Sequence, residues 1–330
     1  MKRTKSAAYL SLSTAMLTVL VGCGQSVSEV NEAKSSESGT KITNCSVEHT
    51  YPAESKKVVA LSPGQADIVA RLGAGDRIAG IAQLNGEKMP ASLTDQGHNP
   101  PVLSQDTPPT REQLLKAQPD LVLSPTTYEF NAEQGYATQE QLKQSGAETY
   151  VAASGCLDNR SKAKVQDFFT DLDAYGKILG REDDAKKLAE QAQQQLDDAA
   201  ARYEGKSKKS VAQLYIEGNN VTAIGAGIEH SIAEAAGADG VFNPDDAAFK
   251  EFFAAEVSRE EILKKNPEAI VFTTTSPEQE QASRTWMKEN LSEVTAVKED
   301  RLIAIPASDM LPGTWGNIDA VTTISQKLYG

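Results

Sequence analysis

The sequence has 330 residues, enough for two ordinary domains and a sizeable core. It is 39% hydrophobic and 24% charged, which is typical of a soluble globular protein. The net charge of −13 argues against a nucleic-acid partner, because phosphate backbones attract basic surfaces, and three cysteines are too few for a disulfide-built scaffold.

The N-terminus has the pattern of an export signal. Three basic residues precede an apolar run over 7–21, which is shorter than the roughly 20 residues of a membrane-spanning helix. The run ends in the letters LVGC, which resemble a bacterial lipobox, and Cys23 is the residue that such a signal lipidates. We expect a signal peptide over 1–22, then lipidated Cys23 and a flexible tether over 23–55, which would anchor an extracytoplasmic protein to the membrane. A soluble secreted protein with a cysteine here by chance is the alternative.

From residue 56 the pattern alternates short β-rich runs with helical segments, which predicts an α/β lobe over 56–160. Thr110 is a typical N-cap residue at the start of one of these helices. We expect strands at 58–61, 77–83, 121–124 and 148–152, and helices at 64–73, from 111, and at 138–145.

Residues 161–204 lack proline and follow a helical period, with a kink or cap at 180–183, and we expect a connecting helix region there. A second α/β lobe follows over 205–330. Its expected strands are at 211–216, 221–225, 269–273 and 301–306, and its helices are at 229–236, at 258–265 and from about 315. The predicted fold is thus two α/β lobes, each a mostly parallel sheet flanked by helices, joined by one long rigid helix with a ligand cleft between them. A single doubly wound domain is the alternative.

Catalytic motifs are missing from the sequence. There is no GxSxG elbow, the three histidines lack the HExxH spacing of zinc hydrolases, and the letters GAG at 225–227 lack the third glycine of a dinucleotide fingerprint. We therefore predict a protein that is not an enzyme, with no catalytic residue, cofactor or metal site.

Four segments resemble, in order and spacing, the substrate-binding proteins of ABC importers for iron chelates, haem and cobalamin. These segments are 56–73, 111–123, 257–272 and 301–324. The resemblance covers most of residues 56–328. It implies two lobes joined by a rigid helix, a small-molecule metal chelate or tetrapyrrole as cargo, and a permease dimer as partner. We expect the protein itself to be a monomer.

Ligands of open α/β sheets contact the loops at the carboxyl ends of the strands. Aromatic side chains there would cover apolar parts of a cargo, although core packing is the alternative for each of them. The ligand contacts that we predict are Pro63, Gly64, Gln65, Gln83, Asn85, Thr127, Tyr128, Phe130 and Tyr136 in the first lobe, and Glu217, Asn219, Asn220, Gly227, Thr275, Ser308 and Trp315 in the second.

Glu112 and Glu260 occupy equivalent positions in REQLL and REEIL, one in each lobe. The resemblance implies that they dock into arginine pockets of the permease, while ordinary helix N-terminal acids are the alternative. For Cys45 and Cys156, an oxidising compartment makes a disulfide compatible with the sequence, as are two free thiols.

The predicted cleft loops contain little Arg or Lys, which favours a neutral or weakly charged cargo. An iron-siderophore complex, such as a ferric hydroxamate, ranks first largely because the resemblance is to a family in which such cargoes are frequent. Cobalamin suits the polar and aromatic side chains of these loops as well. Haem would require an axial ligand such as Tyr128 or His230. Glu129 and Glu217 would instead favour a cationic ligand. Residues 138–156 also resemble a subgroup proposed to carry a deazaflavin cofactor precursor, which is anionic. An extracellular enzyme or a surface adhesin remain alternatives.

Overall fold

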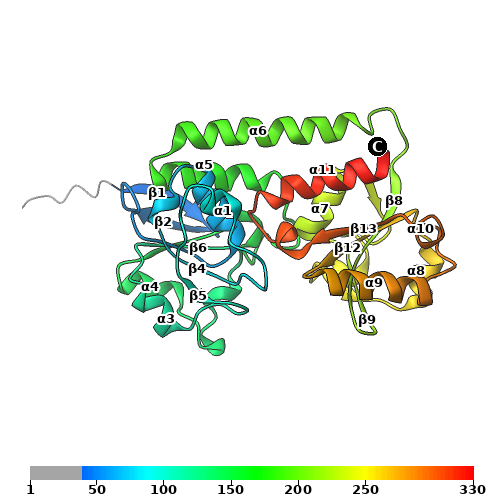
Figure 1. Ribbon diagram of the computed structural model, residues 1–330, viewed down its shortest axis with the longest axis horizontal. Helices are drawn as coiled ribbons and strands as arrows, with labels where there is room; N and C mark the ends of the chain where they lie inside the picture. The colour runs from blue at the N-terminus through cyan, green and yellow to red at the C-terminus, as the bar shows by residue number, and fades with distance from the viewer. Residues whose placement is uncertain (1–38) are drawn as a thin grey trace, which may run out of the picture. The chain divides into compact units, whose positions relative to one another are not determined.

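The computed structural model describes residues 39–330, which form two α/β lobes (Figure 1). The expected signal peptide over 1–22 and the lipid site Cys23 lie outside the described residues. Within 39–330, every helix is too short or too polar to traverse a bilayer.

The N-terminal lobe is built on a five-stranded parallel sheet in the order β5-β4-β3-β6-β7. The strands are β3 (Val58–Ala60), β4 (Ile78–Ala82), β5 (Val102–Ser104), β6 (Leu121–Ser124) and β7 (Glu148–Val151). The helices are α1 (Pro63–Arg71), α2 (Ala91–Thr94), α3 (Arg111–Lys116) and α4 (Gln139–Gln144), with 3-10 turns η1 (Gly75–Arg77), η2 (Tyr128–Phe130), η3 (Ala132–Gln134) and η4 (Ala153–Gly155). Thr110 caps α3 in a capping box, as the sequence predicted.

A β-hairpin precedes this sheet, where we expected the end of the flexible tether. β1 (Thr40–Asn44) pairs antiparallel with β2 (Val47–Tyr51). The side chain of Asn44 exchanges two hydrogen bonds with the backbone of Val151, of 2.7 and 2.9 Å. The tether boundary at residue 55 is therefore wrong, because residues 40–51 are ordered against the end of β7.

A disulfide joins Cys45 to Cys156, with their Cα atoms 5.2 Å apart. Of the two alternatives that the sequence left open, the structure has the bonded one. The bridge links the hairpin turn to the segment that follows β7, so the hairpin is held to the lobe both covalently and by backbone hydrogen bonds.

The helical stretch between the lobes is two helices, α5 (Asp167–Leu179) and α6 (Glu182–Ala201). Gly180 ends α5 with a φ of 62°, a left-handed conformation that glycine adopts without steric penalty. The chain reverses here, since Phe169 of α5 and Ala189 of α6 line one shallow hollow. The predicted connecting helix thus corresponds to α6 alone, which runs along both lobes in Figure 1, while α5 packs on the N-terminal lobe.

The C-terminal lobe is a mixed sheet in the order β11-β9-β8-β12-β13, with β10 also paired to β8. The pairs of β8 with β10 and β12, and of β12 with β13, are parallel, whereas β9 is antiparallel to both of its neighbours. The strands are β8 (Lys209–Glu217), β9 (Asn220–Ile224), β10 (Ala238–Gly240), β11 (Ala254–Glu256), β12 (Ala269–Thr274) and β13 (Leu302–Pro306). The helices are α7 (Gly227–Ala235), α8 (Arg259–Lys265), α9 (Pro277–Asn290), α10 (Thr295–Lys298) and α11 (Gly316–Tyr329), with 3-10 turns η5 (Ala247–Phe249) and η6 (Ala307–Met310).

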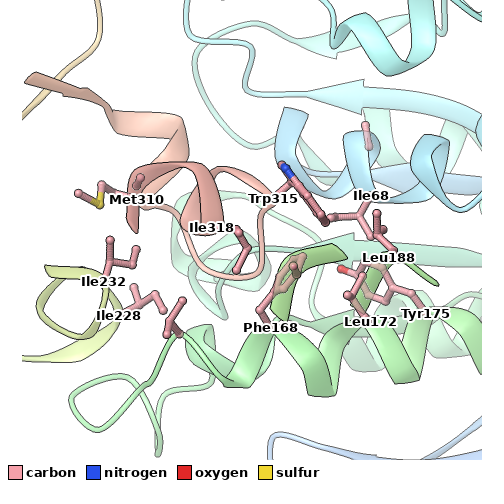
Figure 2. Close-up of a cluster of buried hydrophobic side chains, with 14 of the residues drawn as sticks. Ile68, Phe168, Leu172, Tyr175, Leu188, Ile228, Ile232, Met310, Trp315 and Ile318 are labelled. Atoms are coloured by element: carbon pink, nitrogen blue, oxygen red, sulfur yellow. The ribbon is translucent and has the colours of Figure 1, made fainter. Parts of the chain in front are cut away.

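One apolar cluster is shared by both lobes and the helices between them. Figure 2 shows its middle, where Trp315 lies between Ile68 of α1 and Phe168 of α5. The Trp315 and Phe168 rings meet edge to face, 6.0 Å apart. Ile232 of α7 belongs to the same cluster. Because close-packed interiors resist rearrangement, this shared core fixes the orientation of the lobes and hence the shape of the space between them.

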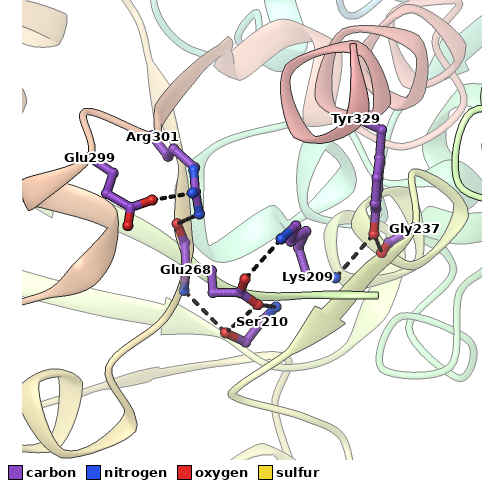
Figure 3. A network of polar contacts seen from close by, with 7 residues as sticks. All are labelled: Lys209, Ser210, Gly237, Glu268, Glu299, Arg301 and Tyr329. Carbon is purple, nitrogen blue, oxygen red and sulfur yellow. Dashed lines mark hydrogen bonds and ion pairs between the residues drawn. The ribbon is translucent and has the colours of Figure 1, made fainter. Parts of the chain in front are cut away.

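A polar network fastens the end of the chain to the start of β8 (Figure 3). The Glu268 carboxylate accepts hydrogen bonds from Lys209 Nζ and from the backbone N–H of Ser210, both at 3.0 Å. The Tyr329 hydroxyl donates to the carbonyl of Gly237 at 2.6 Å and accepts from the N–H of Lys209 at 3.0 Å. The two hydrogen bonds of Tyr329 thus hold the end of α11 against the amino end of β8.

Candidate functional site

The carboxyl ends of strands from the two lobes enclose a cavity of about 320 Å³. That volume falls at the lower end of the usual range for ligand pockets, ~300–1,000 Å³. The N-terminal lobe contributes the loops after β3, β4 and β5, and the C-terminal lobe contributes those after β12 and β13. The lining residues are Pro63, Gln83, Leu84, Asn85, Glu87, Asp106, Thr275, Ala307, Ser308 and Leu311. The cavity therefore lies between the lobes, where open α/β sheets bind ligands.

The loop after β4 is held in a restricted backbone conformation. Gln83 and Asn85 have φ angles of 55° and 50°, in the left-handed region that non-glycine residues rarely adopt. The Gln83 side chain donates to the carbonyl of Leu61 at 2.6 Å, and its N–H donates to Ser104 at 2.9 Å. Backbone outliers of this kind cluster at binding sites, where surrounding contacts maintain them. The loop is thus positioned before any ligand arrives.

The wall of the cavity is largely apolar, with Pro63, Leu84, Ala307 and Leu311, and polar and acidic groups are set into it. Gln83, Asn85, Thr275 and Ser308 supply amide and hydroxyl groups, while Glu87 and Asp106 supply carboxylates. None of the ten lining residues is basic. Amides and hydroxyls can orient a ligand by hydrogen bonds, and the carboxylates disfavour an anion in this space.

A neighbouring hollow of about 220 Å³ shares Pro63, Glu87 and Ser308 with the cavity. The pKa of Asp309 in this hollow is raised to about 6. Burial is the largest cause, and the carboxylates of Asp319, Glu87 and Asp67 add to it. Four acidic residues and two basic ones, Arg71 and Lys88, line this hollow, so carboxylates remain in excess beyond the cavity itself.

The lobes meet a second time around Arg160. Its guanidinium carbon lies 4.7 Å from the ring centroid of Phe253 and 5.6 Å from that of Phe252. Burial lowers the pKa of Arg160, and this is opposed by Glu129 of the N-terminal lobe and Glu229 of the C-terminal lobe. Burial also raises the pKa of Glu229 to about 7, against the effect of Arg160. This cation is thus set between two acids, and aromatic rings cover it.

Exposed aromatic side chains flank this second meeting point. Tyr128 is 48% exposed and packs edge to face on Tyr136, with ring centroids 5.8 Å apart. Phe252 is 50% exposed on the C-terminal lobe. Tyr128 is positioned by its buried neighbour Glu129, which accepts hydrogen bonds from the hydroxyls of Thr126 and Ser124 at 2.6 and 3.1 Å. Flat apolar surface is therefore available from both lobes.

The predicted ligand residues fall into three groups. Five of them line the cavity together, namely Pro63, Gln83, Asn85, Thr275 and Ser308. Gly64 and Trp315 border the neighbouring hollow, and Glu217 borders a third one of about 360 Å³, which meets the cavity at Thr275. The others line none of these three spaces, namely Gln65, Thr127, Tyr128, Phe130, Tyr136, Asn219, Asn220 and Gly227.

Three predicted contacts are interior residues, so we withdraw them. Gln65 is fully buried and its amide donates to the carbonyls of Pro312 and Gly313, at 3.0 and 3.3 Å. Phe130 packs in the core of the N-terminal lobe, and Trp315 packs in the core that the lobes share. In each case an aromatic or amide group near a strand end stabilises the scaffold of the cleft, with little surface left for a ligand.

Gly227 also has a structural reason for its identity. Its φ is 73°, and a Cβ atom there would approach the carbonyl oxygen of Arg160 to 2.7 Å. Asn219 and Asn220, by contrast, are exposed at the turn between β8 and β9. Neither asparagine is among the residues that line the cavity.

Glu112 and Glu260 occupy matching places in the two lobes. Each is exposed in the first turn of its helix, two residues after an N-cap hydroxyl residue, Thr110 in α3 and Ser258 in α8. Acidic side chains at this position also interact favourably with the helix dipole. The geometry thus fits both explanations that the sequence left open.

Four residues of the candidate site were not predicted from the sequence. Asp106 follows β5, a strand of three residues that we did not expect, and Glu87 lies just beyond the loop that we assigned to the site. Arg160 and Phe252 lie in irregular segments, where no period marks them. The adjacent aromatics Phe252 and Phe253 were the available signal.

Both a family model and a curated relative match most of the chain. The family model described as periplasmic binding protein matches residues 58–308. A vitamin B12-binding protein from Yersinia pestis is 22% identical over 258 residues, which are 76% of this chain and 81% of that protein.

Two solved structures share the fold. A periplasmic binding protein from Veillonella parvula is 20% identical with a TM-score of 0.75, over 88% of this chain and 97% of that one. An ABC-type Fe³⁺-hydroxamate transport protein from Saccharomonospora viridis is 22% identical with a TM-score of 0.73, over 88% and 99%. Identities this low show a common fold, and the family match extends over most of the residues that build both lobes. The chain therefore belongs to the periplasmic binding protein family.

Proposed function

We propose that this protein is the solute-binding lipoprotein of an ABC importer and that it captures an iron-siderophore complex outside the cytoplasm. The observation that carries the proposal is the cavity between the carboxyl ends of strands from both lobes. Its amides and hydroxyls suit the oxygen-rich surface of a ferric hydroxamate. Members of this family are binding proteins rather than enzymes, which agrees with the absence of catalytic motifs in the sequence.

The cavity has room for about ten water molecules, at ~30 Å³ for each. A bulky chelate would therefore place one part in the cavity and leave another part against the aromatic side chains near Arg160. Cobalamin would use the same amides and hydroxyls, and it is the second candidate because a relative is named for binding it. Haem and a deazaflavin cofactor precursor remain further candidates.

Titration of the purified protein with four cargoes tests the proposal. The cargoes are a neutral ferric trihydroxamate, cyanocobalamin, haemin and a flavin-type anion, and intrinsic Trp fluorescence reports binding. We expect saturable one-to-one binding of the ferric trihydroxamate with a Kd in the micromolar range or below, and no turnover of the bound complex. Tighter binding of cyanocobalamin would move the assignment to the second candidate. Binding of none of the four would refute the transport role.

Delivery to the permease would use Glu112 and Glu260, whose matching places on the two lobes suit a partner with two-fold symmetry. Arg at both positions should abolish uptake by cells while the purified variant still binds its cargo. The matched control is Arg at Glu190 and Glu289, two exposed acids on α6 and α9. Equal uptake by both double variants would leave the helix dipole as the whole explanation.

Membrane attachment would use a lipid on Cys23. We expect Cys23→Ala to release the protein from membranes into the soluble fraction, with unchanged cargo affinity after purification. Retention of the variant in the membrane fraction would contradict lipid anchoring at this residue.

A further inference from the structure

The cavity contains two carboxylates without a counterion. Glu87 and Asp106 line its wall, and within 39–330 neither side chain forms an ion pair or a hydrogen bond. Glu87 is half-buried, and Asp106 is exposed at the mouth. An unpaired carboxylate in a partly enclosed space acts on a ligand more strongly than it would in bulk water, because less solvent screens it.

The surroundings strengthen the negative potential. The hollow that shares Glu87 with the cavity also contains Asp67, Asp309 and Asp319, and its two basic residues are Arg71 and Lys88. Of these, Asp67 is paired with Arg71, at 2.6 Å. Burial is the main cause that raises the pKa of Asp309, and the neighbouring carboxylates add to it. On the opposite side, the space that meets the cavity at Thr275 adds Glu217 and no basic residue.

Arg160 does not offset this potential for a ligand. The carboxylates of Glu129 and Glu229 interact with its positive charge, and its guanidinium lies against the rings of Phe252 and Phe253. An anion that approached Arg160 would therefore meet two carboxylates as well. The ten residues that line the cavity therefore offer an anion no cation, and the basic residues of the adjoining hollow are Arg71, which is paired with Asp67, and Lys88, which is exposed.

We propose that the cleft selects among metal chelates by charge and favours those with a net positive charge, with Glu87 and Asp106 as the specificity-determining residues. This inference rests on the proposed function, and it names the class of cargo within it. A cationic group on the chelate, such as a free ammonium on a siderophore arm, would lie within the cavity and approach these carboxylates. An anionic group at the same place would be repelled.

The test compares chelates that differ in charge alone. A linear trihydroxamate with a terminal amine gives a ferric complex of charge +1, its N-acetyl derivative gives a neutral complex, and its N-succinyl derivative gives −1. The iron coordination is the same in all three. A second series uses cyanocobalamin, with one side-chain amide extended by an aminoethyl group (+1), left intact (neutral) or hydrolysed (−1). Equilibrium dialysis of each cargo against the purified protein gives Kd.

We expect the Kd to rise by about 3- to 10-fold for each unit of charge from +1 to −1 at low salt. In 1 M salt, where the Debye length is about 3 Å, this dependence should largely disappear. The variant Glu87→Gln/Asp106→Asn should reduce the ratio of Kd between the −1 and +1 complexes to below half of its original value. The matched control Glu190→Gln/Glu289→Gln removes the same number of charges far from the cavity and should keep the original ratio.

Equal affinity for the three charges, or tighter binding of the −1 complex, would overturn the inference while leaving the proposed function intact. A ratio that falls equally in both double variants would also overturn it, because the effect would then come from the net charge of the protein. If neither neutral cargo binds, the proposed function fails and the inference fails with it.

Discussion

The packing of α1 against the loop after η6 allows a test of how the two lobes are joined. Gly64 lies in the first turn of α1, and a Cβ atom at this position would approach Thr314 Cγ2 to 2.2 Å and Thr314 Cβ to 2.7 Å. Real Cβ atoms do not come this close to side-chain carbons, so Gly64→Ala must displace the loop. Overpacking of this kind destabilises a protein by about 1–3 kcal/mol.

The helix propensity of alanine has the opposite effect on stability for the same substitution. Alanine in a helix is favoured over glycine by roughly 0.5–1 kcal/mol. The clash should dominate in the parent protein, giving a net loss of about 0.5–2 kcal/mol in the free energy of unfolding. In the Thr314→Gly background both clashing atoms are absent, so Gly64→Ala should be neutral or stabilising.

Urea unfolding of the four proteins in this double-mutant cycle measures the coupling, which we expect to be about 1–3 kcal/mol. Far-UV circular dichroism reports the helices, and the m-value checks that unfolding stays cooperative. Gly64→Ala with the same effect in both backgrounds would refute the reasoning, since it would show that the loop does not pack on α1 as described.

Three further predictions concern the hairpin, a buried acid and the aromatic side chains. Removing the disulfide by Cys45→Ala/Cys156→Ala should lower the free energy of unfolding by about 2–5 kcal/mol, because the bridge spans a sequence separation of 111. In urea unfolding, the parent protein under reducing conditions should match this variant. Burial raises the pKa of Asp171 to about 7, so the folded state is most stable where this carboxyl is neutral. The free energy of unfolding should therefore fall by up to roughly 4 kcal/mol as the pH rises from about 4 to about 7. Asp171→Asn, which can still accept from Tyr150 and Ala153, should remove that dependence, and parallel pH profiles of the two proteins would contradict it. Finally, Phe252→Ala or Tyr128→Ala should weaken chelate binding about tenfold. The control is Leu157→Ala, which changes an exposed apolar residue beside the disulfide and should leave the Kd unchanged. Equal Kd values for all three variants would show that these aromatics do not contact the cargo.

The elements with a strong local signal were predictable from the sequence. The apolar runs at β3, β6, β8 and β12 and the cap at Thr110 identified both lobes and their order, because buried parallel strands and helix N-termini each need particular residue types. The β1–β2 hairpin was missed since its stability comes from β7 and from a disulfide over 100 residues away. Helix α9 was missed because its exposed surface is polar and only Ser283 and Met287 are buried.

The site was predictable as a set of loops but only partly as a set of residues. Strand ends could be located, so the sequence pointed to Gln83, Asn85, Thr275 and Ser308, which line the cavity. Whether a side chain at a strand end faces the cleft or the interior depends on tertiary packing, and this is why Gln65 was misassigned. Arg160 and Glu229 become neighbours only when the segment after β7 crosses to α7, which no local pattern encodes.

The central claim is that cargo binds between the lobes, and filling the cavity tests it most directly. Ser308→Trp and Thr275→Trp place a bulky ring into the space from two different strand ends, while Thr285→Trp puts the same ring on the exposed side of α9 as a control. Thermal unfolding verifies that all three variants are folded. We predict that the Kd for a neutral ferric trihydroxamate rises at least 30-fold in the two cavity variants and stays within twofold of the parent value in the control. Parent-like affinity in both cavity variants would contradict the claim.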